Sequence, residues 1–171
     1  MPTNIEIKAR VDDRDALAPL AAELADHGPE LLEQDDTFFH CGNGRLKLRA
    51  FPSGRGELIF YRRADDSGPR ASHYQIVPTS EPDQLRAALS AAYGEAGRVR
   101  KARILYLVGR TRVHLDRVEG LGDFLELEVV LRDGEEADQG AAEAHALLRK
   151  LGIDASQLVP TAYVDLLQER G

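Results

Sequence analysis

The sequence predicts an α+β fold in which about eight antiparallel strands close into a barrel, with helices packed on the outside. Most of the strand-like segments alternate apolar and charged residues, as strands with two different faces do. Short turns join most of these segments, which favours antiparallel neighbours. Amphipathic helical segments interrupt the series and need an apolar surface to cover. Closing the sheet into a barrel would also remove its exposed edges.

Residues 4–11 form the first predicted strand and set the pattern, since odd-numbered positions are apolar and even-numbered ones are amide or charged. The other predicted strands cover residues 31–39, 45–51, 57–63, 72–77, 98–108, 110–118 and 124–131. The turn at Gly42-Asn43-Gly44 is a strong hairpin signal. Gly109 and the segment 119–122 separate the last three strands, and a loop is expected over 65–69.

Helices are predicted after the first strand, after the fifth strand and at the end of the chain. Asp12 or Asp13 can cap a helix that runs to about residue 25. The second helix covers 81–93, and the third covers 135–151, where Gly152 stops it. Pro160 opens a short final helix. Each of the three long segments carries an apolar stripe at helical spacing, so each can pack on the barrel.

Length and composition place the chain among ordinary globular proteins. Its 171 residues fit one domain, 1–171, with a single core. The net charge of −7 argues against a general nucleic-acid binder. With Cys41 as its single cysteine, the chain has no internal disulfide and no cysteine zinc cluster. It shows neither a membrane-span pattern nor a signal peptide, so we expect a cytoplasmic protein without a membrane partner.

The charged residues of the strands share one face. They are Glu6, Lys8, Arg45, Lys47, Arg49, Lys101, Arg103, Arg112, His114, Asp116, Glu126 and Glu128, together with either Arg62 or Arg63. The opposite face is apolar and carries Leu46, Leu48, Ile104, Val113, Leu115, Leu125, Leu127 and Val129. If the helices cover the apolar outside of the barrel, the charged residues must line its interior.

So many buried charges need pairing, hydration or a ligand. Carboxylates are the oxygen ligands that Mg²⁺ and Mn²⁺ prefer, and Lys and Arg bind phosphate oxygens. Glu126 and Glu128 are the informative pair, because a spacing of two on a strand sets both carboxylates side by side. A divalent cation between them would relieve their repulsion. The sequence therefore predicts a combined metal and polyphosphate site.

Several ordered motifs carry a family resemblance along nearly the whole chain. They lie at 4–8 (NIEIK), 34–39 (QDDTFF), 44–49 (GRLKLR), 58–63 (LIFYRR), 101–103 (KAR), 112–116 (RVHLD) and 121–128 (LGDFLELE). In these motifs the chain resembles the CYTH domain, the triphosphate tunnel metalloenzymes, and most closely the branch named after class IV adenylyl cyclase. The resemblance implies an eight-stranded tunnel that holds a triphosphate and one or two divalent metal ions.

The resemblance also implies residue roles. Glu6, Glu126, Glu128 and Asp116 would be Mg²⁺ or Mn²⁺ ligands, and with Lys8 they form the implied catalytic set. The implied phosphate-binding residues are Lys8, Lys47, Arg49, Arg63, Lys101, Arg103 and Arg112. Asn4 departs from the family pattern, because it stands where the first Glu of an ExExK motif belongs. This change puts a second metal ion in doubt.

Two activities fit the implied site. A cyclase would convert ATP to cyclic AMP and pyrophosphate, and a triphosphatase would hydrolyse thiamine triphosphate, a nucleotide or inorganic tripolyphosphate. The motifs favour the cyclase-like reading. A non-catalytic polyphosphate- or nucleotide-binding module is the third alternative, and Asn4 is its main support. In each case the partner is a small-molecule triphosphate; the sequence leaves open whether the chain forms a homodimer.

Some residues have two readings from the sequence alone. His114 is either a proton relay or a hydrogen-bonded interior histidine, with the second favoured. Asp36 lies either near the metal or in solvent at a strand end. Tyr61 and Tyr74 either stack on a base or pack in the fold, again with the second favoured.

Overall fold

The computed structural model describes residues 1–63 and 68–170. Its strands are β1 (Thr3–Arg10), β2 (His27–Phe39), β3 (Arg45–Ala50), β4 (Gly56–Arg63), β5 (Arg70–Thr79), β6 (Glu95–Val108), β7 (Thr111–Val118) and β8 (Gly122–Val130). Its helices are α1 (Arg14–Leu24), α2 (Pro82–Tyr93), α3 (Ala137–Lys150) and α4 (Tyr163–Arg170), with a 3₁₀ turn at Ala155–Gln157. The predicted loop over 65–69 lies mostly outside the described residues.

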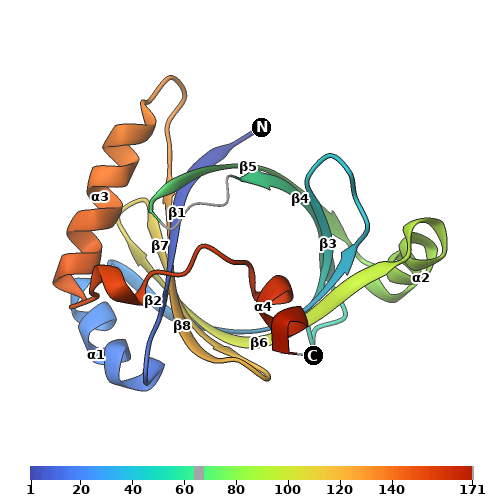
Figure 1. The fold of residues 1–171 in the computed structure, drawn as a ribbon, viewed down its shortest axis with the longest axis horizontal. Coiled ribbons are helices and arrows are strands. Elements are labelled where there is room, and N and C mark those ends of the chain that lie inside the picture. The colour runs from blue at the N-terminus through green and yellow to red at the C-terminus, as the bar shows by residue number, and fades with distance from the viewer. Residues whose placement is uncertain (64–67, 171) are drawn as a thin grey trace.

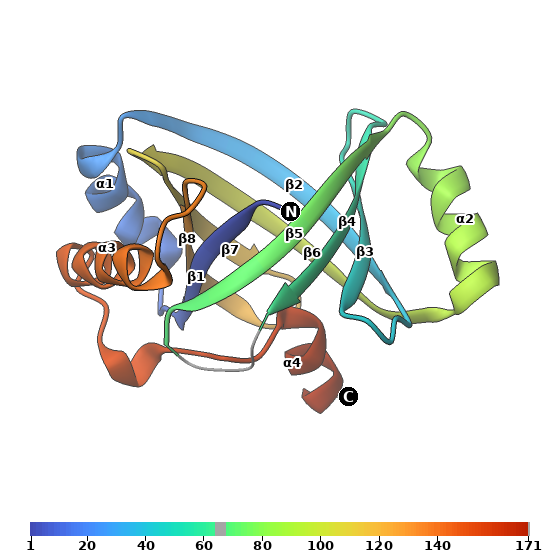
Figure 2. The same cartoon turned by 90° about the horizontal axis from the view of Figure 1, so that it is seen from above.

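The eight strands form a closed antiparallel barrel in the order β1-β5-β4-β3-β2-β6-β7-β8. Figure 1 looks along the barrel and shows its ring of strands, with α1 and α3 on one side and α2 on the other. Figure 2, turned by 90°, shows α4 at one end of the barrel. The predicted barrel with external helices is confirmed.

The apolar strand faces point outward and form the main core against α1 and α3. Ile5 and Ile7 of β1, and Leu125 and Leu127 of β8, are at most 2% exposed. They pack with Leu147 of α3 and its neighbours in one cluster. Since burying each such side chain contributes about 1.5–3 kcal/mol, this packing fixes which strand face points outward. The charged face of each strand is thereby turned into the barrel.

The strand boundaries differ from the prediction mainly where two long strands pair. β2 begins at His27 rather than at residue 31, and β6 begins at Glu95 rather than at 98. The two strands pair from His27 with Leu107 to Phe39 with Glu95. Likewise β5 is longer than predicted, because it pairs along the whole of β4. Cross-strand hydrogen bonds, which local pattern does not reveal, set these limits.

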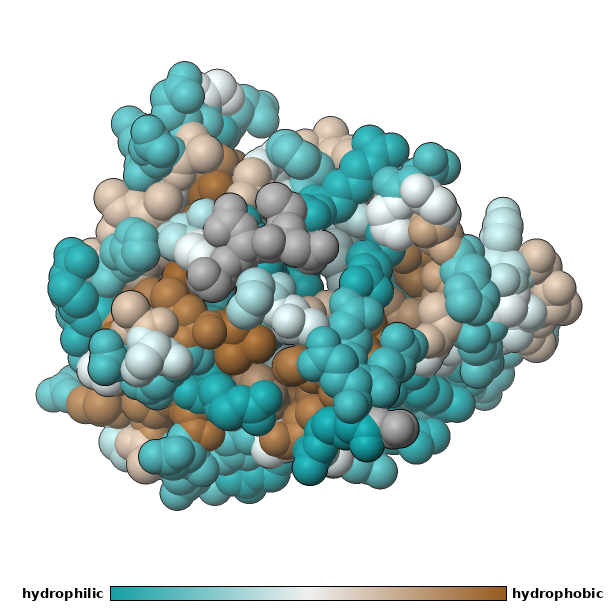
Figure 3. Space-filling model, viewed as in Figure 1, coloured by the Kyte–Doolittle hydropathy of each residue, from teal (hydrophilic) through white to brown (hydrophobic). Residues whose placement is uncertain are grey.

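The C-terminal segment crosses one end of the barrel before α4. Gly97 on β6 permits the approach, because a Cβ there would clash with Val164. Phe38, Val99 and Phe124 form a second apolar cluster with Ala162 and Tyr163. Figure 3 shows this end: hydrophilic residues cover much of the face, and apolar residues gather along the path that the C-terminal segment takes in Figure 1. The segment therefore packs over the barrel end. The final helix begins at Tyr163 and not at Pro160.

Candidate active site in the barrel interior

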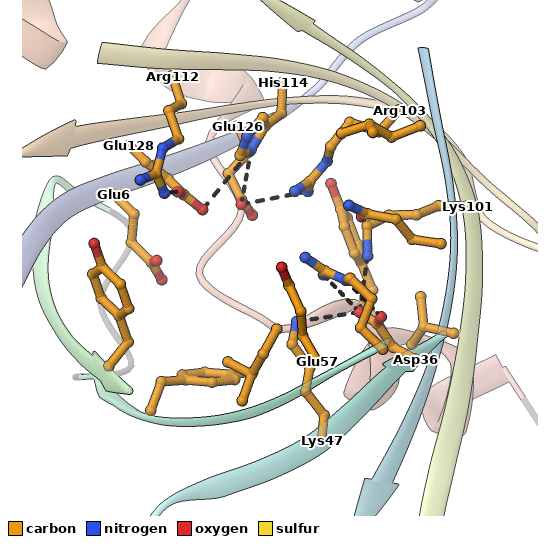
Figure 4. Close-up of a pocket in the computed structure, with 18 of the residues that line it drawn as sticks. Glu6, Asp36, Lys47, Glu57, Lys101, Arg103, Arg112, His114, Glu126 and Glu128 are labelled. Atoms are coloured by element: carbon orange, nitrogen blue, oxygen red, sulfur yellow. Dashed lines mark hydrogen bonds and ion pairs between the residues drawn. The ribbon is translucent and has the colours of Figure 1, made fainter. Parts of the chain in front are cut away.

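A cavity of about 450 Å³ runs inside the barrel. Residues predicted from the charged strand faces line it: Glu6, Lys8, Lys47, Arg49, Arg63, Lys101, Arg103, Arg112, His114, Glu126 and Glu128. Figure 4 shows that the labelled side chains among them come from strands around the barrel and point into one space. The expectation that the charged faces share the interior is confirmed for these residues; Arg45 and Asp116, which were also assigned to this face, do not line the cavity.

Asp36 holds three cations on one wall of the cavity. Its two carboxylate oxygens accept hydrogen bonds from Arg49 Nε and Nη2, both at 2.8 Å. Lys101 Nζ lies 3.1 Å and Lys47 Nζ 3.2 Å from Asp36 Oδ2. Burial acts to raise the pKa of Asp36, but the three cations outweigh it and hold this pKa well below its usual range. The structure therefore supports neither place predicted for Asp36. The carboxylate is buried rather than in solvent, and it is occupied by three cations rather than placed near the metal.

Asp116 holds Arg103 in the same way. Arg103 donates to both oxygens of Asp116, at 2.7 and 2.8 Å, and Tyr163 Oη donates to Oδ2 at 2.8 Å. Asp116 is fully buried behind Arg103 and is not among the residues that line the cavity. Its carboxylate thus orients the Arg103 guanidinium, which also lies 3.6 Å from Glu126.

Two lysines in the cavity have lowered pKa values. Burial is the main cause that lowers the pKa of Lys101, to about 7, and the nearby Arg49, Arg103 and Lys47 add to this effect while Asp36 opposes it. Burial likewise lowers the pKa of Lys8 to about 8. Both ammonium groups lie near the Tyr163 ring, 4.4 Å from its centroid for Lys8 and 5.8 Å for Lys101. An anion bound beside them would favour their charged forms.

Carboxylates gather on the opposite wall. Glu126 and Glu128 lie on β8, and their cross-strand neighbours on β1 are Lys8 and Glu6. Burial is the main cause that raises the pKa of Glu6, with Glu126 adding to it, although Arg63 Nη1 donates to Glu6 Oε1 at 2.6 Å. Burial also acts to raise the pKa of Glu126, but His114 and Arg103 outweigh it and hold this pKa well below its usual range.

The donor set on this wall fits a divalent cation. His114, Glu126 and Glu128 each offer a ligand atom, and these atoms lie within 4.8 Å of one another. Among the described residues, Asn4 Oδ1 and His114 Nδ1 are buried atoms without a hydrogen-bond partner. Such orphaned atoms beside two carboxylates are what a site for a bound cation would leave. Figure 4 shows His114 directed at the two glutamates.

The structure settles which cations face the interior. Arg63 lines the cavity, whereas Arg62 is exposed and donates to the Asn43 carbonyl. Arg45 is not a lining residue, because it pairs with Asp165 of α4. Arg112 reaches Glu128 at 3.4 Å. The register of β4, which the sequence left open, is thus fixed by its pairing with β3 and β5.

Sequence reasoning missed three residues of the site. Arg70 of β5 is buried and lies 3.7 Å from Glu6. The predicted strand began two residues after it, so it was not assigned. Glu57 lines the cavity because it shares strand parity with Arg63, a signal that the sequence did contain. Tyr163 enters from α4, and no strand pattern could have placed it there.

The two ends of the cavity differ. At one end Ala162 and Tyr163 pack on Phe38 and Val99. The opposite ends of β2 and β6 contribute Leu32 and Leu105, and Phe51, Tyr74 and Ile76 also line this part. Ile76 is 42% exposed. One end is therefore covered by the C-terminal segment, and the other is open and carries apolar and aromatic side chains together with Glu30 and Glu57.

Comparison with known proteins agrees with this architecture. The model of the CYTH domain matches residues 2–163. The chain belongs to the CYTH family. It is 26% identical to adenylate cyclase CyaB of Aeromonas hydrophila over 178 aligned positions, covering 96% of this chain and 88% of the relative. The resemblance read from the ordered motifs is thus confirmed.

Solved structures share the fold. The PH1012 protein of Pyrococcus horikoshii superimposes with a TM-score of 0.86 at 23% identity, covering 96% of this chain and 99% of the other. HpAC1 from Hippeastrum, an adenylyl cyclase candidate with a dominant triphosphatase activity, superimposes with a TM-score of 0.68 at 16% identity, covering 99% and 96%. Among the described helices, none has the length and apolar character needed to cross a membrane.

Proposed function

We propose that this CYTH protein is a divalent-metal-dependent enzyme that acts on a triphosphate inside its barrel, with adenylate cyclase-like activity on ATP. One observation carries the proposal. A single cavity has the cations around Asp36 on one wall and Glu6, Glu126 and Glu128 on the other, where Arg63, Arg103 and Arg112 lie beside these glutamates. The first wall suits phosphate oxygens, and the second suits Mg²⁺ or Mn²⁺.

The cations are held in place before any ligand binds. Arg49 and Arg103 are each fixed by two hydrogen bonds to a buried carboxylate, so their remaining N–H groups need no reorganisation to meet a phosphate. Lys8, Lys47, Lys101, Arg63 and Arg112 complete the proposed phosphate-binding set. We assign Asp116 to the positioning of Arg103, since its oxygens are already occupied by Arg103 and Tyr163.

Glu6, Glu126 and Glu128 would hold the metal ion, which supplies charge neutralisation and polarises phosphate oxygens when bound. In the cyclase reaction the ribose 3′-hydroxyl gives up its proton to solvent, its oxygen forms a bond to the α-phosphorus, and the bond from this phosphorus to the pyrophosphate oxygen breaks. The guanidinium and ammonium groups of the first wall would offset the negative charge that develops on the departing pyrophosphate.

The open end favours a substrate with an organic group. Tyr74 and Ile76 on one side, and Leu32, Phe51 and Leu105 on the other, offer apolar and aromatic surface continuous with the charged cavity. A nucleobase can stack or pack on such surface, whereas inorganic tripolyphosphate would leave it unused. The relative named adenylate cyclase supports the same choice.

A triphosphatase is the second candidate, and the covered end of the cavity favours it. Lys8 and Lys101 lie beside Tyr163 at this end, so a terminal phosphate could be held there among cations. Water attack on the terminal phosphorus of thiamine triphosphate, a nucleotide or tripolyphosphate would then use the same residues. HpAC1, whose fold is similar, is described with this activity.

A panel of substrates tests these functions. Purified protein is incubated with ATP, thiamine triphosphate and tripolyphosphate under Mg²⁺ and under Mn²⁺, and the products are resolved by chromatography. Cyclic AMP with pyrophosphate supports the cyclase, and orthophosphate release supports the triphosphatase. Tight binding of all three compounds without turnover would instead indicate the non-catalytic binding module.

A further inference from the structure

His114 stands out in the carboxylate wall because its ring nitrogen is buried without a hydrogen-bond partner. Its side chain is 6% exposed, and Nδ1 lies 3.6 Å from Glu126 Oε1 and 3.8 Å from Glu128 Oε1. Both separations exceed hydrogen-bond length. A buried polar atom left in this state is costly unless something absent from the protein chain satisfies it.

The separations suit a shared cation. Two ligand atoms that each lie about 2.1 Å from one ion are separated by roughly 3–4.2 Å. The two distances from His114 Nδ1 fall in this range. The geometry therefore favours an ion between the three groups.

Asn4 lies beside one of the same two glutamates. Its Oδ1 is also buried without a hydrogen-bond partner, and its Nδ2 donates to Glu128 Oε2 at 3.5 Å. Two orphaned atoms from different strands, β1 and β7, thus flank one glutamate. Asn4 can offer only a neutral oxygen, and the glutamates also offer oxygen. The imidazole of His114 is therefore the nitrogen ligand in this group of four residues.

We propose that His114 Nδ1 is a ligand of the divalent ion held by Glu126 and Glu128, and that this nitrogen makes the site prefer Mn²⁺ to Mg²⁺. The inference rests on the metal site of the proposed function. Mg²⁺ strongly favours oxygen donors, whereas imidazole contributes more to the binding of the first-row transition metals. A site of two carboxylates and one imidazole therefore discriminates more strongly between Mn²⁺ and Mg²⁺ than a site of carboxylates alone.

Binding of Mn²⁺ and of Mg²⁺ to the full chain tests this inference without any substrate. Free Mn²⁺ is followed by its electron paramagnetic resonance signal, and Mg²⁺ is measured by competition. We expect wild-type protein to bind Mn²⁺ at least tenfold more tightly than Mg²⁺. His114→Gln should weaken Mn²⁺ binding by about tenfold or more and Mg²⁺ binding by less than about threefold. The matched control is His73→Gln, because His73 is an exposed histidine on β5.

A second measurement does not depend on a His114 variant. Electron spin echo modulation of bound Mn²⁺ should show coupling to an imidazole nitrogen in the wild-type protein and in His73→Gln. Mn²⁺ bound without this coupling would overturn the role of His114 and leave the proposed function standing. So would unchanged or tighter Mn²⁺ binding by folded His114→Gln, which would identify His114 as a cation that competes with the metal. If neither ion binds, the metal site and the proposed function fail together.

Discussion

At the scale of single residues, the site is built from charges whose neighbours fix their protonation. Neighbouring side chains outweigh burial and lower the pKa of Asp36 and of Glu126, whereas burial, with Glu126 adding to it, raises the pKa of Glu6. Lys101 is buried among cations, and its pKa falls to about 7. Glu6 and Glu126 lie on the same wall yet their pKa values shift in opposite directions, so the burial and immediate neighbours of each group set its protonation.

Glu128→Gln should abolish metal-dependent turnover, by at least a hundredfold, while the protein stays folded. Glu128 has 15% of its side chain exposed and pairs loosely with Arg112 at 3.4 Å, so the amide fits its place. Turnover at saturating Mn²⁺ measures the loss of activity, and thermal unfolding measures whether the variant stays folded. Glu119→Gln, on the turn between β7 and β8, is the control. Wild-type turnover by folded Glu128→Gln would refute the assignment.

Lys101 should couple triphosphate binding to proton uptake. The pKa of Lys101 is about 7 in the free protein, and bound phosphate raises it because phosphate favours the ammonium form. At a pH between the free and the bound pKa values, Lys101 therefore gains a proton when the triphosphate binds. Affinity should therefore fall as the pH rises from 7 to about 9. Calorimetry of tripolyphosphate binding at pH 8, in buffers of different ionisation enthalpy, measures the uptake. Lys101→Arg stays charged and should take up fewer protons; equal uptake would contradict the role of Lys101.

At the scale of elements, β2 organises the cationic wall because it offers a different carboxylate to each side of the sheet. Asp36 points inward to Arg49, Lys47 and Lys101, whereas Asp35 points outward to Arg98 and Arg100. The two aspartates are adjacent in sequence, yet the Asp35 side chain is 29% exposed and that of Asp36 is 1% exposed, and they have different partners. The pair allows the stability contributed by a buried carboxylate, Asp36, to be compared with that contributed by a more exposed one, Asp35.

Asp36→Asn should destabilise the fold by about 3–5 kcal/mol, because it leaves three buried cations without their anion. Asp35→Asn should cost about 0–1 kcal/mol. The folded pKa of Asp36 lies well below the unfolded value near 3.8. Its stabilisation is therefore fully present above that value, begins to decrease below it, and is lost as the pH falls through the folded pKa. Urea unfolding at pH 7 and pH 3 should show the difference between wild type and Asp36→Asn shrinking. Added tripolyphosphate should restore stability to Asp36→Asn, and equal losses for both variants would contradict this account.

The α4 helix contributes to the site through Tyr163. Burial raises the pKa of Tyr163 well above its usual range, and Asp116 adds to the effect, so the hydroxyl remains a donor to this carboxylate. Tyr163→Phe keeps the ring beside Lys8 but removes a hydrogen bond to a charged group, which should cost about 1.5–3 kcal/mol in urea unfolding. Tyr93→Phe, at an exposed position on α2, should cost little. Identical stability of the two variants would mean that the Tyr163 hydroxyl is not important.

At the scale of the whole molecule, barrel closure turns scattered charges into one site with two unlike ends. The cations and carboxylates meet in the middle, Tyr163 covers one end, and apolar side chains line the open end. An elongated substrate can therefore enter with its phosphates first. Its organic part would remain near Tyr74 and Ile76.

Tyr74→Ala should raise KM for ATP by about tenfold if the base packs on this ring, with little effect on tripolyphosphate. Steady-state kinetics with both compounds measure the difference. Gln75→Ala, the exposed neighbour on the outer face of β5, is the matched control. An equal loss with both compounds would place Tyr74 in the support of the barrel rather than in recognition of the base.

The sequence by itself determined the strand faces, the antiparallel pairing of neighbours and the presence of a charged interior. Alternation has a period of two, so Glu126 and Glu128 had to share a face, and the apolar stripes of α1 and α3 had to cover the other. The KAR and RVHLD motifs likewise placed Lys101, Arg103 and Arg112 correctly on the inner wall.

Only the tertiary structure decided which partner each charge has. Arg63 rather than Arg62 faces the interior because the register of β4 depends on hydrogen bonds to strands distant in sequence. Asp116 faces Arg103 and Tyr163, and His114 faces the glutamate pair, because shear between strands moves residues of equal parity to different depths. Parity is a local property of the chain, whereas depth along the barrel is set by how all eight strands close.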